Sequence, residues 1–137
     1  MKRARVEAER WLAQAKSDLG FAEVGLREGF FAQACFICQQ AAEKALKALH
    51  YLGGARIVLG HSLVELLDAV VANHAGLADL REGAQQLDQY YIATRYPNGL
   101  PGGVPANVFT RRQADEAVSL ARRFVAFVDA AIGSRER

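Results

Sequence analysis

Apolar residues recur at spacings of three and four positions through most of the chain, which is the period of an amphipathic α-helix. A first helix over about residues 5–28 is predicted from one such stripe, formed by Trp11, Ala15, Leu19, Ala22 and Leu26. A second helix over 31–52 follows, and its stripe consists of Phe31, Ala34, Cys35, Cys38, Ala42, Ala45, Leu46 and Leu49. Gly29 and the pair Gly53-Gly54 are the predicted ends of these helices, because glycine commonly terminates a helix.

Capping signals and a proline place the next two helices. Ser62 and Glu65 have the three-residue spacing of a capping box, which predicts the start of a short third helix. A turn over 73–76 separates it from a fourth helix that runs from position 77 to about Tyr96. That helix should stop there because the residue before a proline, here Pro97, is pushed out of the helical region.

All three prolines of the chain lie in one segment, 97–109, together with three glycines. A connection of this length is usually functional or mobile. Thr110 and Gln113 then form a second capping box, which predicts a fifth helix that frays in 134–137. The predicted architecture is all-α, an up-and-down bundle of about five helices in one domain spanning 1–137.

Composition narrows the class of protein without identifying its function. The chain has 137 residues, of which 51% are hydrophobic and 23% charged, as in an ordinary globular protein. A net charge of +2 is too small to indicate nucleic-acid binding by the whole molecule, so any such site must be a local patch. No apolar run approaches the ~18 residues of a membrane span, and the N-terminal residues lack the apolar core of a signal peptide. We therefore expect a cytoplasmic protein.

The second predicted helix has one polar side. At 100° per residue, Gln40, Glu43, Lys44 and Lys47 share that side, and alanines and leucines share the other. The simplest interpretation of the two lysines is a solvated face. One turn earlier, Phe36 and Ile37 fall on the same side, so the first half of this helix is apolar nearly all round. This pattern predicts a central helix whose outer edge helps to form a dimer.

Two further motifs resemble chemical sites. Cys35 and Cys38 match C-x-x-C, but they lie inside a predicted helix and are better interpreted as small core residues. Four suitably spaced ligands for zinc are lacking, so no metal and no cofactor are expected. The tyrosines at 90, 91 and 96 could stack on bases beside the guanidinium of Arg95, or they could simply pack the end of a helix.

Four segments, taken in order, resemble the HEPN family of small helical domains, of the minimal prokaryotic type. The first helix supplies Trp11, Asp18 and Leu19; the second supplies Gln39, Gln40, Ala41, Glu43, Lys44, Lys47 and Ala48. The third segment is His61, Ser62 and Leu63 with Leu66 and Leu67, and the fourth is Tyr91, Arg95, Tyr96 and Pro97. The resemblance implies a helical bundle that dimerises, that is commonly paired with an MNT-type nucleotidyltransferase in toxin-antitoxin modules, and that has a proposed nucleotide-binding role.

Many HEPN proteins are metal-independent ribonucleases that use an R-x4-6-H motif, whose arginine and histidine meet across the dimer. The chemistry suits these groups, because a histidine can move the 2'-hydroxyl proton and an arginine can hold the phosphate. Here Arg95 is the arginine of that region, and no histidine stands at positions 100–102. A literal match occurs elsewhere, in Arg56 and His61, in the loop before the third helix.

Three hypotheses follow from these observations. The first is a non-catalytic, dimeric HEPN domain that binds a nucleotidyltransferase and a nucleotide or RNA phosphate, through the 97–109 loop and four candidate contacts: Lys44, Lys47, Arg95 and Tyr96. The second is a metal-independent endoribonuclease toxin whose catalytic residues are Arg56 and His61, or a histidine from the partner. The third is a purely structural assembly domain without a ligand.

Overall fold

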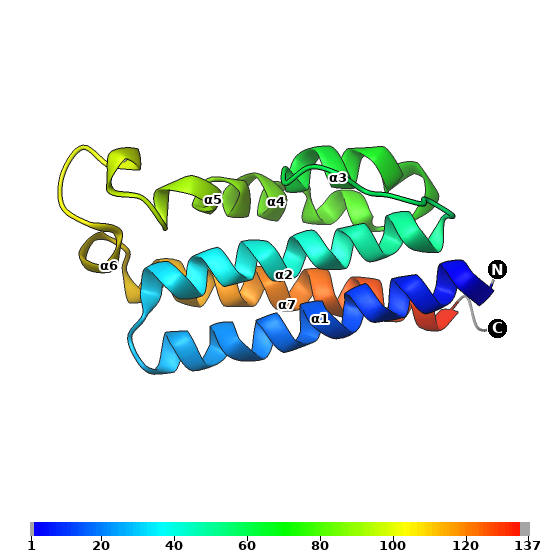
Figure 1. The fold of residues 1–137 in the computed structure, drawn as a ribbon, viewed down its shortest axis with the longest axis horizontal. Coiled ribbons are helices and arrows are strands. Elements are labelled where there is room, and N and C mark those ends of the chain that lie inside the picture. Colours follow the sequence, from blue (N-terminus) through cyan, green and yellow to red (C-terminus); the bar gives the residue numbers. More distant parts are fainter. Residues whose placement is uncertain (1, 135–137) are drawn as a thin grey trace.

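The computed structural model describes residues 2–134, with only the backbone described for residue 2. Three long helices, α1 (Lys2–Arg27), α2 (Phe31–Leu52) and α7 (Arg111–Ser134), lie side by side along the molecule (Figure 1). Three shorter helices, α3 (Leu63–Val70), α4 (Arg81–Asp88) and α5 (Tyr90–Ala93), form a layer against α2. The chain is an all-α helical bundle, as predicted, and the described residues contain no strand.

Helix α2 is the centre of the bundle, since it contacts both long helices and each of the three shorter ones. Most of its residues are buried, including Ala34, Ala41 and Ala48 at seven-residue spacing. Small side chains let neighbouring helices approach closely, and a Cβ placed on Gly25 of α1 would lie 3.4 Å from the Cβ of Ala34. The side chain with the largest volume in the fully buried core is Phe124 of α7.

The predicted helix boundaries are confirmed where glycine or a capping box sets them. Helix α2 has the predicted bounds. The hydroxyl of Ser62 accepts a hydrogen bond from the Glu65 amide at 3.2 Å, at the start of α3. At the start of α7, the Thr110 amide donates to Gln113 Oε1 at 2.9 Å, and the Gln113 amide donates to Thr110 Oγ1 at 3.2 Å.

The fourth helix was predicted to be continuous, and this prediction is wrong. The segment consists of a 3-10 turn over Leu77–Leu80 followed by α4 and α5, and its last helix ends at Ala93. The break comes where the Gln89 amide bonds the Gln86 carbonyl, three residues back, at 3.2 Å.

The 97–109 loop has local structure that was not predicted. It contains a 3-10 turn over Pro97–Gly99 and α6 (Pro105–Val108). Each begins with a proline, whose fixed φ suits a first helical position. Helix α1 begins three residues earlier than predicted. Fraying was predicted for 134–137, but α7 includes Ser134; the remaining positions, 135–137, lie outside the described residues.

The two cysteines are core residues of α2, as predicted. Both are free and fully buried, and burial raises the pKa of the Cys35 thiol to about 12. Residues 2–134 hold no group of three or more side chains that could bind a metal ion. Within the same residues, no helix combines the length and the apolarity needed to cross a membrane.

Candidate functional site

The polar side of α2 is partly buried in the folded protein, where Gln40 and Lys44 on it are half-buried. Glu43 and Lys47 are only 5% and 6% exposed, and Gln39 is fully buried. The interpretation of this side as a solvated face is therefore wrong for Lys47. Its ammonium lies 5.8 Å from the ring centroid of Trp11, because α1 packs along this part of α2. Trp11 in turn stacks on Tyr51 at 5.3 Å and serves as an anchor between α1 and α2.

Glu43 is the centre of a buried polar cluster. Its carboxylate accepts from Lys47 Nζ at 3.2 Å, from His61 Nδ1 at 3.2 Å and from Gln39 Nε2 at 3.3 Å. A buried carboxylate is tolerated when charged or polar donors replace its water, and these three donors come from α2 and from the loop before α3. The cluster therefore ties that loop to the central helix.

His61 is held in one orientation on the surface. Its Nδ1 contacts Glu43, its ring stacks on Tyr91 with centroids 4.9 Å apart, and its carbonyl accepts from Gln39 Nε2 at 2.9 Å. The side chain is nevertheless 58% exposed, and Nε2 has no partner among the described residues. With Nδ1 donating to the carboxylate, the neutral imidazole presents the lone pair of Nε2 to solvent.

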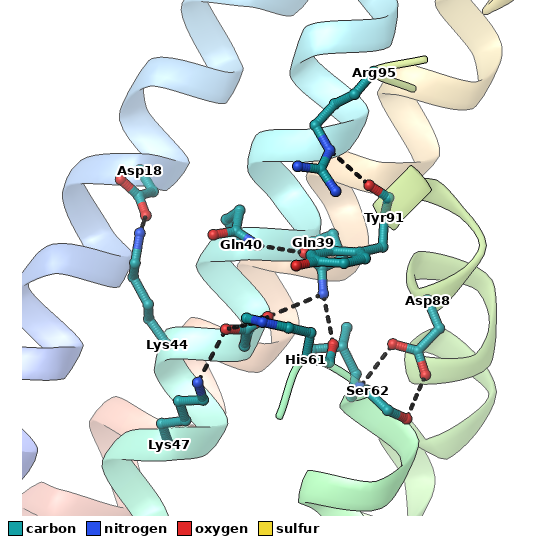
Figure 2. Close-up of polar contacts among 12 residues, drawn as sticks. Asp18, Gln39, Gln40, Lys44, Lys47, His61, Ser62, Asp88, Tyr91 and Arg95 are labelled. Carbon is teal, nitrogen blue, oxygen red and sulfur yellow. Dashed lines mark hydrogen bonds and ion pairs between the residues drawn. The ribbon is translucent and has the colours of Figure 1, made fainter. Parts of the chain in front are cut away.

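Asp88 of α4 fixes the end of the same loop. Its carboxylate accepts from the Leu63 amide at 2.7 Å, the Val64 amide at 3.2 Å and the Ser62 hydroxyl at 3.1 Å (Figure 2). A carboxylate at a helix N-terminus satisfies free amides and interacts favourably with the helix dipole. Sequence reasoning missed this residue, because no local motif marks a cap that comes from 25 positions away.

Arg95 lies on the other side of Tyr91 from His61. Figure 2 shows the Tyr91 ring between the guanidinium and the imidazole. The guanidinium carbon lies 4.5 Å from the ring centroid of Phe36, 4.6 Å from that of Tyr91 and 5.1 Å from that of Tyr96. Its Nε donates to the Tyr91 carbonyl at 2.8 Å, and no carboxylate in the described part of the chain pairs with it. The result is an exposed arginine, fixed by aromatic rings, with its terminal nitrogens unpaired.

Both candidate lysines already have acidic partners. Lys44 Nζ lies 2.5 Å from Asp18 Oδ2, in a pair that joins α2 to α1, and Lys47 is bonded to Glu43 (Figure 2). Of the four residues proposed to contact a nucleotide or RNA, only Arg95 and Tyr96 are exposed and without a carboxylate partner in the described residues.

The three tyrosines have different surroundings. Tyr90 is buried edge-on against Phe109, and burial raises the pKa of its hydroxyl, so it packs the end of the helix. Tyr91 has a cation or an imidazole on each face. Tyr96, about half exposed, keeps ring surface available for stacking.

Within one protomer, Arg56 and His61 lie in different surroundings. Arg56 lines a hollow of about 930 Å³ beside the first turns of α1, whereas His61 lines a separate hollow of about 400 Å³ against α3. No hydrogen bond or ring contact within residues 2–134 joins the two side chains. Their spacing in the sequence satisfies the R-x4-6-H pattern, but the fold places them in different surroundings.

An apolar hollow lies at the opposite end of α1 and α2, where the two helices are joined. It encloses about 290 Å³, and its lining includes Phe21, Val24, Phe30 and Ile37. Phe21 is 63% exposed, and Phe30 is also exposed. Ile37 was predicted to belong to a partner surface and lies in this hollow, whereas Phe36 packs beneath Arg95.

The chain is similar to one known domain family and to several solved structures. The model of the HEPN domain matches residues 8–131. TT1696 from Thermus thermophilus is 44% identical, with a TM-score of 0.85 over 90% of this chain and 97% of that one. ST0689, described as an archaeal HEPN homologue, is 36% identical, with a TM-score of 0.76 over 92% and 98% of the two chains. An HEPN domain protein from Thermotoga maritima, tm0613, is 32% identical, with a TM-score of 0.72 over 90% and 98%. No curated protein matches this chain.

Proposed function

Because this chain belongs to the HEPN domain family, we propose that it is a non-catalytic, dimeric HEPN domain that binds a partner protein, an MNT-type nucleotidyltransferase, and the phosphate of a nucleotide or RNA. The proposed phosphate binding rests on the exposure and the contacts of Arg95. Its guanidinium is exposed, is oriented by three rings and has no acidic partner in the described residues. Arginine held in this way loses little side-chain entropy when it binds a phosphate.

The neighbours of Arg95 support a phosphate-bearing ligand with a base. Tyr96 offers an exposed ring beside the guanidinium, and stacking on such a ring is tolerant of base identity. Lys44 contributes less charge, because Asp18 already neutralises it. Lys47 is paired with Glu43, so we assign it to positioning the cluster around Glu43 and not to direct contact with the ligand.

The geometry favours binding over catalysis within one protomer. The ring of Tyr91 lies between Arg95 and His61, which supports binding without cleavage in one protomer (Figure 2). One observation favours the alternative, a metal-independent ribonuclease: Glu43 holds His61 with Nε2 free of any partner in the described residues, as a general base requires. If the protein is such a ribonuclease, it should cleave RNA in EDTA, and His61→Ala should abolish the cleavage. If Arg56 and His61 are both catalytic, Arg56→Ala should abolish it too.

The apolar hollow at the α1–α2 end supports a dimer. Burying Phe21 would contribute about 1.5–3 kcal/mol, so Phe21→Glu should dissociate the dimer. We expect wild-type protein to sediment as a dimer in analytical ultracentrifugation and Phe21→Glu as a monomer. Leu59→Glu is the matched control, since it alters a more exposed apolar residue elsewhere and should remain dimeric. A monomeric wild type, or dissociation by the control variant only, would contradict this assignment.

The partner class is tested by co-expression with an MNT-type nucleotidyltransferase from the same genome. We expect the two proteins to co-elute from a size-exclusion column as a complex larger than the HEPN dimer. Separate elution at micromolar concentration would overturn the proposed pairing and leave the ligand site to be judged on its own measurements.

A further inference from the structure

The two most exposed large apolar side chains of the described residues lie close together in the connection between α2 and α3. Ile57 is 75% exposed and Leu59 is 83% exposed, whereas Val58 between them is buried. This alternation is that of an extended strand with one face on the core. We call residues 55–61 the strap, and Figure 1 shows it as a drawn-out loop running beside α3. Isolated exposed apolar residues are common, but two on one side of an extended segment indicate a contact surface.

The backbone of the strap is largely unpaired. Its first amide, at Ala55, bonds the His50 carbonyl at 3.1 Å, and its last carbonyl, at His61, accepts from Gln39 Nε2 at 2.9 Å. Between these anchors, residues 56–60 make no hydrogen bond with any other described residue. These residues leave backbone donors and acceptors free, but Arg56 lies in a bend and Gly60 has a φ of +102°, so residues 57–59 are the part that can pair as an edge strand does.

Two arginines lie beside this edge without acidic partners. Arg56 and Arg3 of α1 line the hollow of about 930 Å³ next to the strap, and neither has an ion pair or hydrogen bond in the described residues. The one carboxylate of that hollow, on Glu7, already accepts from Arg10 at 2.6 Å and from Trp11 Nε1 at 3.3 Å. The strap therefore has two arginines without acidic partners beside its start. Its apolar residues Ile57 and Leu59 line the neighbouring hollow against α3, and the one carboxylate of that neighbouring hollow is that of Glu65.

We propose that the strap binds an extended, acidic segment of a partner protein as an added strand. The partner's backbone would pair with residues 57–59, its apolar side chains would lie beside Ile57 and Leu59, and its carboxylates would bond Arg3 and Arg56. A second copy of this chain fits poorly, because the strap sequence RIVLGH brings an arginine and no carboxylate. The proposal rests on the proposed role in partner binding, but it depends neither on Arg95 nor on the apolar hollow at the α1–α2 end.

The test is a selection of random displayed peptides on the immobilised full chain, with counter-selection against the Arg3→Glu/Arg56→Glu variant. We expect the enriched peptides to carry alternating apolar residues and at least two acidic ones. A synthetic representative should bind the double variant about tenfold or more weakly than the wild type. Arg112→Glu/Arg123→Glu, which reverses the charges of two other exposed arginines on α7, is the matched control and should bind normally. Phe21→Glu should also bind normally, which separates this proposal from the dimer.

Backbone pairing is tested directly with the same peptide. We expect hydrogen exchange of the amides at 57–59 to slow when the peptide is added, and N-methylation of alternate peptide amides to abolish binding. The proposal is overturned if no enriched peptide depends on Arg3 and Arg56, or if the N-methylated peptide binds equally well. Two other results would also overturn it. Protection of those amides at higher protein concentration without peptide would identify a second copy as the occupant. Protection only in the presence of anionic vesicles would identify a lipid surface.

Discussion

Replacing Glu43 with alanine should lower the free energy of unfolding by about 3–5 kcal/mol, because it leaves the buried ammonium of Lys47 without its counter-charge. His61 and Gln39 lose a partner in the same step. The midpoint of urea unfolding measures the change. Glu9→Ala is the matched control, since Glu9 pairs with Arg5 on the exposed side of α1, and it should cost no more than about 1 kcal/mol.

A double variant separates the buried charge from the loss of packing. Glu43→Leu/Lys47→Leu removes both charges and should cost less than Glu43→Ala alone, because an apolar pair leaves no unpaired buried ion. If Glu43→Ala unfolds at the same urea concentration as Glu9→Ala, the cluster is not what ties the loop before α3 to α2.

Replacing Arg95 with alanine should weaken binding of a short single-stranded RNA about tenfold or more, because the exposed guanidinium is the main unpaired donor of the proposed site. Fluorescence anisotropy with a labelled RNA measures the affinity. Arg95→Lys should recover only part of it, since a lysine lacks the planar fork that the three rings orient. Arg123→Ala is the control for loss of one positive charge. If Arg95→Ala and Arg123→Ala bind alike, or the wild type does not bind, the purely structural assembly domain becomes the better account.

Local signals in the sequence were sufficient for the fold class and for several helix ends. Gly53 follows the last residue of α2, and the capping boxes begun by Ser62 and Thr110 start α3 and α7. These signals work because capping is decided within one helical turn. The break within the fourth predicted helix was missed, because the apolar period continues across Gln89 while the backbone changes its hydrogen-bond pattern.

Several residues of the candidate site could be named from the sequence, but Asp88 was missed and their arrangement was not predicted. The resemblance included Glu43, His61, Tyr91 and Arg95, and the structure brings them into one connected group. A helical projection separates two sides of α2, but it does not say which side another element covers, so the burial of Lys47 was not predicted. Likewise, a spacing of residues along an extended segment says little about proximity, and Arg56 and His61 lie in different hollows.

The central claim is that this HEPN domain binds a phosphate-bearing ligand at Arg95 without cleaving it. The most direct measurement is incubation of the wild type with short single-stranded RNA in EDTA, read both by anisotropy and by the length of the recovered RNA. We expect the wild type to bind the RNA and leave it intact, and Arg95→Ala to bind it much more weakly. RNA that is cut by the wild type and left intact by His61→Ala would contradict this claim and identify the protein as a metal-independent ribonuclease.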